Sequence, residues 1–239
     1  MRRIVSGIRY GFAVRFADVL FFPQPDWTLT EKKVRSFEQF FDKIRNKNNT
    51  GGVEYRNQYP KWELLQYLAD HKGLFLHGSN RMDINELLPR EQTDFSGMEV
   101  KAVFATRDSI WAIFFAIVDM QVYRGSLRNA CWEIRDAGGK VRRYYFFSLN
   151  REILVEQPWT EGMVYFLPGE TFRPALTGMV RFDEWLSVDS VKPVASLCVS
   201  PRDFPFKGNI AGHREGESMI KSWMLYKYRL KRASEVISA

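Results

Sequence analysis

The order of apolar and polar residues predicts helices in the first half of the chain and strands in the second. Apolar and basic residues alternate over residues 8–16, which predicts one or two strands within residues 1–20. Thr28 and Glu31 have capping-box spacing, so we expect a helix to begin there. Its apolar face would comprise Val34, Phe37, Phe40, Phe41 and Ile44.

Helix and strand signals continue up to residue 120. Pro60 suits the first turn of a helix that runs to Asp70 and ends at Gly73. The composition of residues 46–52 is typical of a loop. The other elements expected here are a buried strand at 74–76, a short helix at 84–88, a strand at 102–105 and an apolar helix at 108–119 with Asp108 as its N-cap.

After residue 120 the pattern becomes that of strands. The elements expected are a hairpin of strands 131–134 and 141–149, strands at 164–167, 180–188 and 194–199, and a helix at 216–233. Helices first and strands later indicate an α+β fold. We expect residues 1–72 to be an N-terminal extension packed on a core of residues 73–212, and residues 213–239 to be a basic C-terminal helix.

Composition narrows the classes of partner. With 239 residues, 45% of them hydrophobic, the chain can bury a large core. Its net charge of +7 fits either an ordinary basic surface or a polyanionic partner such as nucleic acid. The apolar run Ile110–Val118 is shorter than the ~20 residues needed to span a bilayer, so we expect no membrane partner and no signal peptide.

The two cysteines add no site chemistry. Cys131 and Cys198 lie in apolar strand-like runs, without a CxxC pattern or clustered histidines. We therefore expect buried thiols, no metal site and a reducing, cytoplasmic location.

A His-Gly-Ser segment follows the apolar run at residues 74–76. His77, Gly78 and Ser79 would place an imidazole, a bare backbone and a hydroxyl together at a sheet edge. Glycine lets a flat ring approach the main chain, whose N–H and C=O can pair with a carboxamide. Histidine can bind a ribose hydroxyl. Alone, the tripeptide is common and more typical of a surface turn with a hydrogen-bonded histidine.

A second motif follows at residues 103–114. It comprises Val103-Phe104-Ala105 and then Ser109-Ile110-Trp111-Ala112-Ile113-Phe114. Together with His-Gly-Ser, this order resembles the NAD-binding half of the poly(ADP-ribose) polymerase and diphtheria-toxin branch of ADP-ribosyltransferases. The resemblance implies that His77 binds the adenosine ribose, that Gly78 and Ser79 hold the nicotinamide amide, and that Phe104, Ser109 and Phe114 line the pocket. Phe114 would be the stacking ring.

The sequence departs from that family pattern at three positions, of which Phe114 in place of the usual Tyr is the mildest because it keeps the stacking face. Val103 stands where the family usually has Tyr, and Trp111 stands where it has the Ser that binds the carboxamide. These departures argue against a polymer-forming enzyme. They leave a non-catalytic NAD- or ADP-ribose-binding module as an alternative.

Glu184 is the candidate catalytic residue. It lies in the apolar run Val180–Val188, where a carboxylate costs desolvation unless it has a partner or a purpose. Asp183-Glu184-Trp185 matches the family's catalytic-glutamate segment. By that resemblance Glu184 stabilises the positive charge that develops on the ribose as nicotinamide leaves. The plain alternative is an edge-strand glutamate that faces water.

The resemblance covers residues 74–199 and implies an ADP-ribosyltransferase-like split β-sheet core with flanking helices. The function expected is transfer of one ADP-ribose from NAD to a macromolecule, either nucleic acid or protein; a toxin or defence role would suit this chemistry. An NAD-dependent RNA 2′-phosphotransferase is a second alternative, for which His71 and Lys72 are the nearby basic residues.

Overall fold

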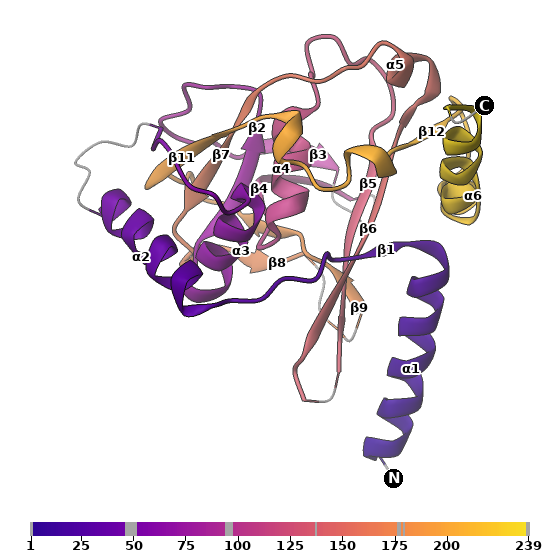
Figure 1. The fold of residues 1–239 in the computed structure, drawn as a ribbon, viewed down its shortest axis with the longest axis horizontal. Coiled ribbons are helices and arrows are strands. Elements are labelled where there is room, and N and C mark those ends of the chain that lie inside the picture. Colours follow the sequence, from indigo (N-terminus) through magenta and orange to yellow (C-terminus); the bar gives the residue numbers. More distant parts are fainter. Residues whose placement is uncertain are drawn as a thin grey trace.

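The computed structural model describes residues 2–45, 52–93, 98–136, 138–175, 178 and 180–237. Its helices are α1 (Arg2–Leu20), α2 (Glu31–Arg45), α3 (Lys61–His71), α4 (Ser109–Ile117), α5 (Arg151–Val155) and α6 (Met219–Ile237), with short 3-10 turns at Pro201–Asp203 and Lys207–Asn209. The fold class is α+β, with helices set around mainly antiparallel sheets (Figure 1).

Within the described residues, the strands form three sheets. The largest has the order β1 (Phe22–Pro23), β6 (Val141–Asn150), β5 (Arg128–Arg135) and β9 (Val180–Phe182), and β12 (Ala211–His213) also pairs with β6. The second has the order β3 (Arg90–Thr93), β4 (Glu99–Ala105), β10 (Trp185–Ser187) and β8 (Arg173–Pro174). The third has the order β11 (Ala195–Val199), β7 (Gly162–Leu167) and β2 (Phe75–Ser79).

Helix α4 lies centrally, between the sheet that contains β2 and the long β5–β6 hairpin (Figure 1). Two glycines allow its close approach to β2 and β7. A Cβ atom on Gly78 would lie 1.9 Å from the carbonyl oxygen of Ala112, and one on Gly162 would lie 2.0 Å from that of Ala116. Both positions therefore require glycine, because any side chain would overlap the helix backbone.

The larger of two buried apolar clusters among the described residues contains side chains from both ends of the chain. It extends from Ala17 on α1 to Tyr226 on α6, and includes Phe37 of α2, Leu65 of α3 and Phe147 of β6. Residues 1–72, 73–212 and 213–239 all contribute to it. Strand β1, from the first of these segments, and strand β12, at the boundary of the other two, pair with different stretches of β6. Cys131 is buried and Cys198 is partly exposed, so the prediction of two buried thiols is wrong for the second.

The predicted helices with one apolar face are confirmed. Phe37, Phe40 and Ile44 of α2 are buried as predicted, although its cap is Thr30, whose Oγ1 accepts from the Lys33 N–H at 3.3 Å. Asp108 caps α4 by accepting from the Trp111 N–H at 2.7 Å. The predicted hairpin and the strands around residues 102, 164 and 195 are also present. The loop expected at 46–52 lies, apart from Gly52, outside the described residues.

The strands predicted within residues 1–20 are wrong, because this segment is helix α1. Over so short a run, apolar residues that alternate with basic ones can also fall on one side of a helix. Tyr10, Ala13, Val14 and Ala17 pack on the core, and the small alanines let the helix lie close to it.

Two further predictions are wrong. Residues 84–88 form no helix; Leu87 instead exchanges two backbone hydrogen bonds with Val191, each 2.9 Å long. The strand predicted at 180–188 is divided into β9 and β10, which pair with different sheets. The break falls at Asp183 and Glu184.

Candidate functional site

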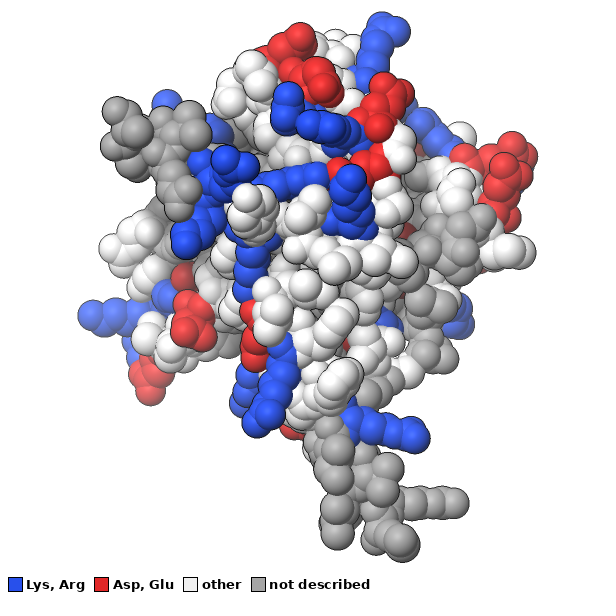
Figure 2. Space-filling view, turned by 90° about the vertical axis from the view of Figure 1, so that its right-hand side faces the viewer, with Lys and Arg blue, Asp and Glu red and all other residues white. Residues whose placement is uncertain are grey.

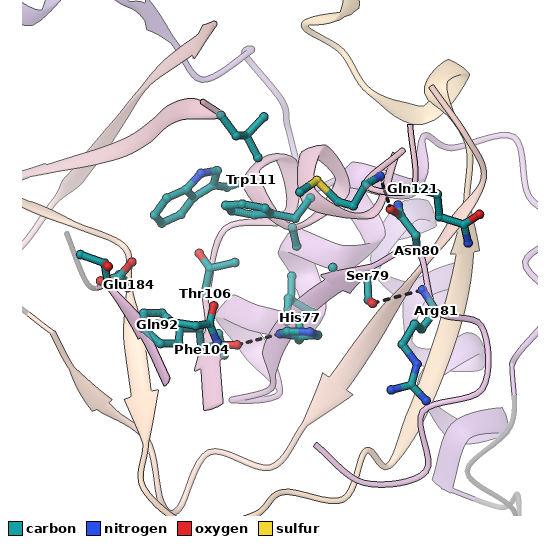
Figure 3. A pocket seen from close by; sticks show the side chains of 18 residues that line it. His77, Ser79, Asn80, Arg81, Gln92, Phe104, Thr106, Trp111, Gln121 and Glu184 are labelled. Carbon is teal, nitrogen blue, oxygen red and sulfur yellow. Dashed lines mark hydrogen bonds between the residues drawn. The ribbon is translucent and has the colours of Figure 1, made fainter. Parts of the chain in front are cut away.

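A cavity of about 630 Å³ lies between β2, β4 and α4 (Figure 3). This volume falls in the range of roughly 300–1,000 Å³ that is typical of small-molecule sites. Five of the residues predicted for the site line it: His77, Gly78, Ser79, Phe104 and Glu184. In Figure 3 Glu184 lies on one side of the cavity and Arg81 on the other, with His77 between them.

The tautomer of His77 follows from its partner. Its Nδ1 lies 2.8 Å from the carbonyl oxygen of Phe104, which can only accept, so Nδ1 carries the hydrogen. Burial lowers the pKa of His77, and the positive charge of Arg90 lowers it further, whereas the hydrogen bond to Phe104 raises it. The neutral ring therefore keeps a lone pair on Nε2, which can accept a hydrogen bond from a hydroxyl group.

Gly78 contributes its backbone. Leu76 exchanges N–H···O bonds of 2.8 and 2.9 Å with Thr106, on the side of β2 away from β7. In an antiparallel ladder, residues two apart direct their N–H and C=O to the same side, so those of Gly78 also point away from β7. They lie at the edge of β2 where Gly78 lines the cavity. This edge can pair with a group that has both a donor and an acceptor.

Ser79 ends β2 at a turn. Its Oγ accepts from the N–H of Arg81 at 3.2 Å, as Figure 3 shows. Asn80 fixes the same turn, because its Nδ2 donates to the Ala116 carbonyl at 2.7 Å and its Oδ1 accepts from the Met120 N–H at 2.8 Å. The Ser79 hydroxyl keeps its own hydrogen for a further partner.

Ser109 and Phe114 do not line the cavity, so their predicted roles are wrong. Ser109 is fully buried, and its Oγ has no hydrogen-bond partner among the described residues. The ring centroid of Phe114 lies 4.6 Å from that of Phe147, inside the apolar core. The side of α4 that faces the cavity carries Trp111, Ala112 and Phe115 instead.

Trp111 and Phe115 are therefore the two aromatic side chains of α4 that line the cavity. They lie four residues apart and share one side of the helix, which is not the side of Ser109 or Phe114. The Trp111 indole N–H donates to Asn129 Oδ1 at 2.5 Å, which orients the ring, and Phe115 is 37% exposed. Helical spacing from Trp111 was the available signal for Phe115 in the sequence.

Glu184 occupies the break between β9 and β10. Asp183, directly before it, is fully buried and holds the break in place. The Asp183 carboxylate accepts from Thr106 Oγ1 at 3.1 Å, from the Arg107 N–H at 3.0 Å and from the Trp185 indole N–H at 2.7 Å. Since Thr106 also pairs with Leu76 of β2, Asp183 fixes the position of the Glu184 backbone relative to β2.

A largely buried group of charges surrounds Asp183, and the sequence motifs did not point to it. Glu133 Oε2 accepts from Arg181 at 2.6 and 2.7 Å, and Glu133 Oε1 lies 3.3 Å from Arg143. Burial and the negative charge of Glu133 raise the pKa of Asp183 to about 7, although the positive charge of Arg143 acts to lower it. Burial also raises the pKa of Asp108. Acidic residues inside apolar strands were the signal for this group.

Two other features of the described residues bear on the site: metal-binding clusters and the basic residues His71 and Lys72. The described residues contain no cluster of three His, Cys, Asp or Glu side chains that could hold a metal ion. His71 stacks on Tyr67, and Lys72 donates to Glu38 at 2.8 Å; neither lines the cavity.

Across the part of the chain that the structure describes, each helix is too short or too polar to cross a membrane. Comparison with protein-family models, curated proteins and solved structures found no match for this chain.

Proposed function

We propose that the protein is an NAD-dependent ADP-ribosyltransferase that transfers one ADP-ribose unit to a macromolecule. The observation that carries the proposal is the convergence, in one cavity, of the open Gly78 edge, the neutral imidazole of His77 and the carboxylate of Glu184. These groups come from segments about 100 residues apart in the chain. Tertiary structure alone brings them together.

Each group matches one part of NAD. The carboxamide of nicotinamide carries a carbonyl acceptor and an N–H donor, which are complementary to the N–H and C=O of Gly78. The Nε2 lone pair of His77 can accept a ribose hydroxyl. Trp111 and Phe115 offer aromatic surface for the nicotinamide ring. The cavity volume is sufficient for a substantial part of a dinucleotide.

The reaction needs little from the protein beyond charge and position. The bond between the nicotinamide nitrogen and ribose C1′ breaks, and nicotinamide leaves with the electron pair. Glu184 would stabilise the positive charge on the ribose during this step. An oxygen or nitrogen atom of the acceptor then forms a bond to C1′ and releases its proton.

The sheet arrangement supports a split β-sheet core like that of ADP-ribosyltransferases. β2 and β4 belong to different sheets and are joined by the backbone bridge from Leu76 to Thr106. The cavity is lined from both sides of this junction, by Gly78 and Ser79 of β2 and by Phe104 of β4. A ligand between the two sheets would contact both.

One observation favours a second candidate, a non-catalytic NAD-binding module. Helix α4 presents Trp111 to the cavity and keeps the only nearby serine of the motif, Ser109, in the core. The helix thus offers no hydroxyl to the carboxamide, which would weaken the hold on nicotinamide. The RNA 2′-phosphotransferase alternative has no such support, because His71 and Lys72 lie outside the cavity.

The decisive experiment measures nicotinamide release from NAD in a single turnover, with wild type and Glu184→Gln. The amide keeps the shape but not the charge, so the rate should fall by about 10²–10³-fold while NAD affinity changes little. Glu156→Gln, at an exposed glutamate outside the cavity, is the matched control. A Glu184→Gln rate within about threefold of wild type contradicts catalysis by this residue.

Two further outcomes separate the candidates. NAD binding without any turnover in wild type supports the binding module. Labelled NAD incubated with separate protein, DNA and RNA pools identifies the acceptor, and the net charge of +7 leads us to expect label in a nucleic-acid pool.

A further inference from the structure

The outward side of α1 is apolar where a surface helix is usually polar. Phe12, Phe16 and Val19 form one row along it and are 74%, 52% and 70% exposed. Arg9 and Arg15 are also exposed, and helical geometry places them about 60° to either side of Phe12. The row is thus flanked by positive charge on both sides.

Helix α6 repeats the pattern. Ile220, Met224 and Tyr228 are spaced by four residues and are 67%, 70% and 56% exposed. Residues 219–232 of the helix contain five Lys or Arg and no Asp or Glu. Lys221 and Arg232 are exposed beside the apolar row.

The two helices belong to one face of the molecule. Lys227 of α6 donates to the backbone oxygen of Asp18 of α1 at 2.6 Å, and the rings of Phe21 and Trp223 lie 6.0 Å apart beneath them. Figure 2 views this face and shows Lys and Arg spread over it, with uncharged surface between them. We call this surface, the outward sides of residues 9–19 and 219–232, the terminal-helix face.

We propose that the terminal-helix face binds an anionic lipid surface, with both helices lying in the plane of the headgroups. Apolar rows flanked by Lys and Arg are typical of helices that bury one side in the headgroup–acyl boundary. Long basic side chains can reach the lipid phosphates while the apolar row stays below them. Phe12, Val19, Ile220 and Met224 would then leave water.

Other occupants fit these residues less well. A nucleic acid would satisfy the basic residues, but it would leave the aliphatic surface of Val19, Ile220 and Met224 against phosphates or water. A second copy joined through the same face would bring like charges together. The expected absence of a membrane partner rested on the lack of a spanning segment, and a helix that lies on the surface needs none.

The test is flotation of the full chain with vesicles of phosphatidylcholine alone and of phosphatidylcholine mixed with phosphatidylserine. We expect binding to the mixed vesicles only. Phe12→Ser with Met224→Ser should weaken it roughly tenfold or more, since large apolar groups no longer leave water. Arg15→Glu with Lys221→Glu should weaken it by at least about fivefold per residue, and added salt should have a similar effect.

Matched controls change equally exposed residues elsewhere. Val155→Ser with Val188→Ser removes apolar groups that are each 77% exposed, and Lys101→Glu with Lys140→Glu reverses two exposed charges. Both controls should bind as wild type does. The proposal is overturned if wild type does not float with mixed vesicles, or if control and test variants lose binding equally. A nucleic-acid partner replaces the proposal if the protein binds oligonucleotides and not vesicles. In that case Phe12→Ser with Met224→Ser should leave the oligonucleotide affinity unchanged.

Discussion

His77 donates its Nδ1 hydrogen to the carbonyl oxygen of Phe104 at 2.8 Å, and this bond joins strands of two different sheets. The bond has two consequences. It orients the imidazole at the cavity, and it leaves Nε2 as an acceptor. A single side chain is therefore both a link between β2 and β4 and a candidate ligand-binding group.

Replacing His77 with alanine should raise the NAD dissociation constant by roughly 2- to 12-fold, which corresponds to a net hydrogen bond of about 0.5–1.5 kcal/mol. Titration calorimetry measures it. His71→Ala is the control, because His71 stacks on Tyr67 outside the cavity and should not affect NAD. An unchanged dissociation constant in His77→Ala would remove His77 from the site.

Gly78→Ala should prevent normal folding rather than block the ligand alone. Its Cβ would lie 1.9 Å from the Ala112 oxygen, and helix backbone cannot move aside as a side chain could. We expect the free energy of unfolding in urea to fall by about 3 kcal/mol or more, the upper range for overpacking. Gly208→Ala, which has no atom within 4 Å of its Cβ, is the control. A variant as stable as wild type would show that α4 lies farther from β2.

Asp183→Asn should change how stability depends on pH. Burial raises the pKa of Asp183 to about 7 in the folded protein from an ordinary 3.8, so the folded state holds the proton more tightly than the unfolded state. Its contribution to stability is full below about pH 4 and is lost as pH rises towards 7. The variant removes this titration. Urea unfolding at several pH values should show a smaller decline for Asp183→Asn than for wild type, whereas parallel curves would mean that Asp183 is ionised throughout.

We expect His213, which lies in a separate polar network, to make stability depend on pH in the opposite direction. Its Nε2 lies 2.6 Å from Ser126 Oγ and its Nδ1 lies 2.8 Å from Ser148 Oγ. Burial, with the charge of Arg128, lowers the pKa of His213 to about 4 from an ordinary 6.5. The stability that it contributes is full above about pH 6.5 and is lost as pH falls towards 4.

His213→Asn should therefore lose less stability than wild type between pH 7 and pH 4.5, although it is less stable at pH 7 where the network is broken. Urea unfolding at the two pH values provides the comparison. If wild type and variant lose equal stability on acidification, His213 is not the group that titrates.

The sequence by itself determined the elements whose signals are local. The apolar face of α2, the Asp108 cap of α4 and the β5–β6 hairpin each depend on residues within a few positions of one another, and the local chemistry decides them. The sequence also suggested His77, Gly78 and Glu184 as site residues through a resemblance in their order, and the structure places all three at one cavity. The α+β class came from the same local signals.

Only the tertiary structure decided the features that depend on distant neighbours. Residues 1–20 fit both a strand and a helical period, and packing against the core selects the helix. Which side of α4 faces the cavity depends on where β2 and β4 lie, so Phe115 and not Phe114 reaches it. The run 180–188 divides because Asp183 is bound by Thr106 and Arg107, groups about 75 residues earlier in the chain. Hydrogen bonds and packing at such separations leave no periodic trace in the sequence.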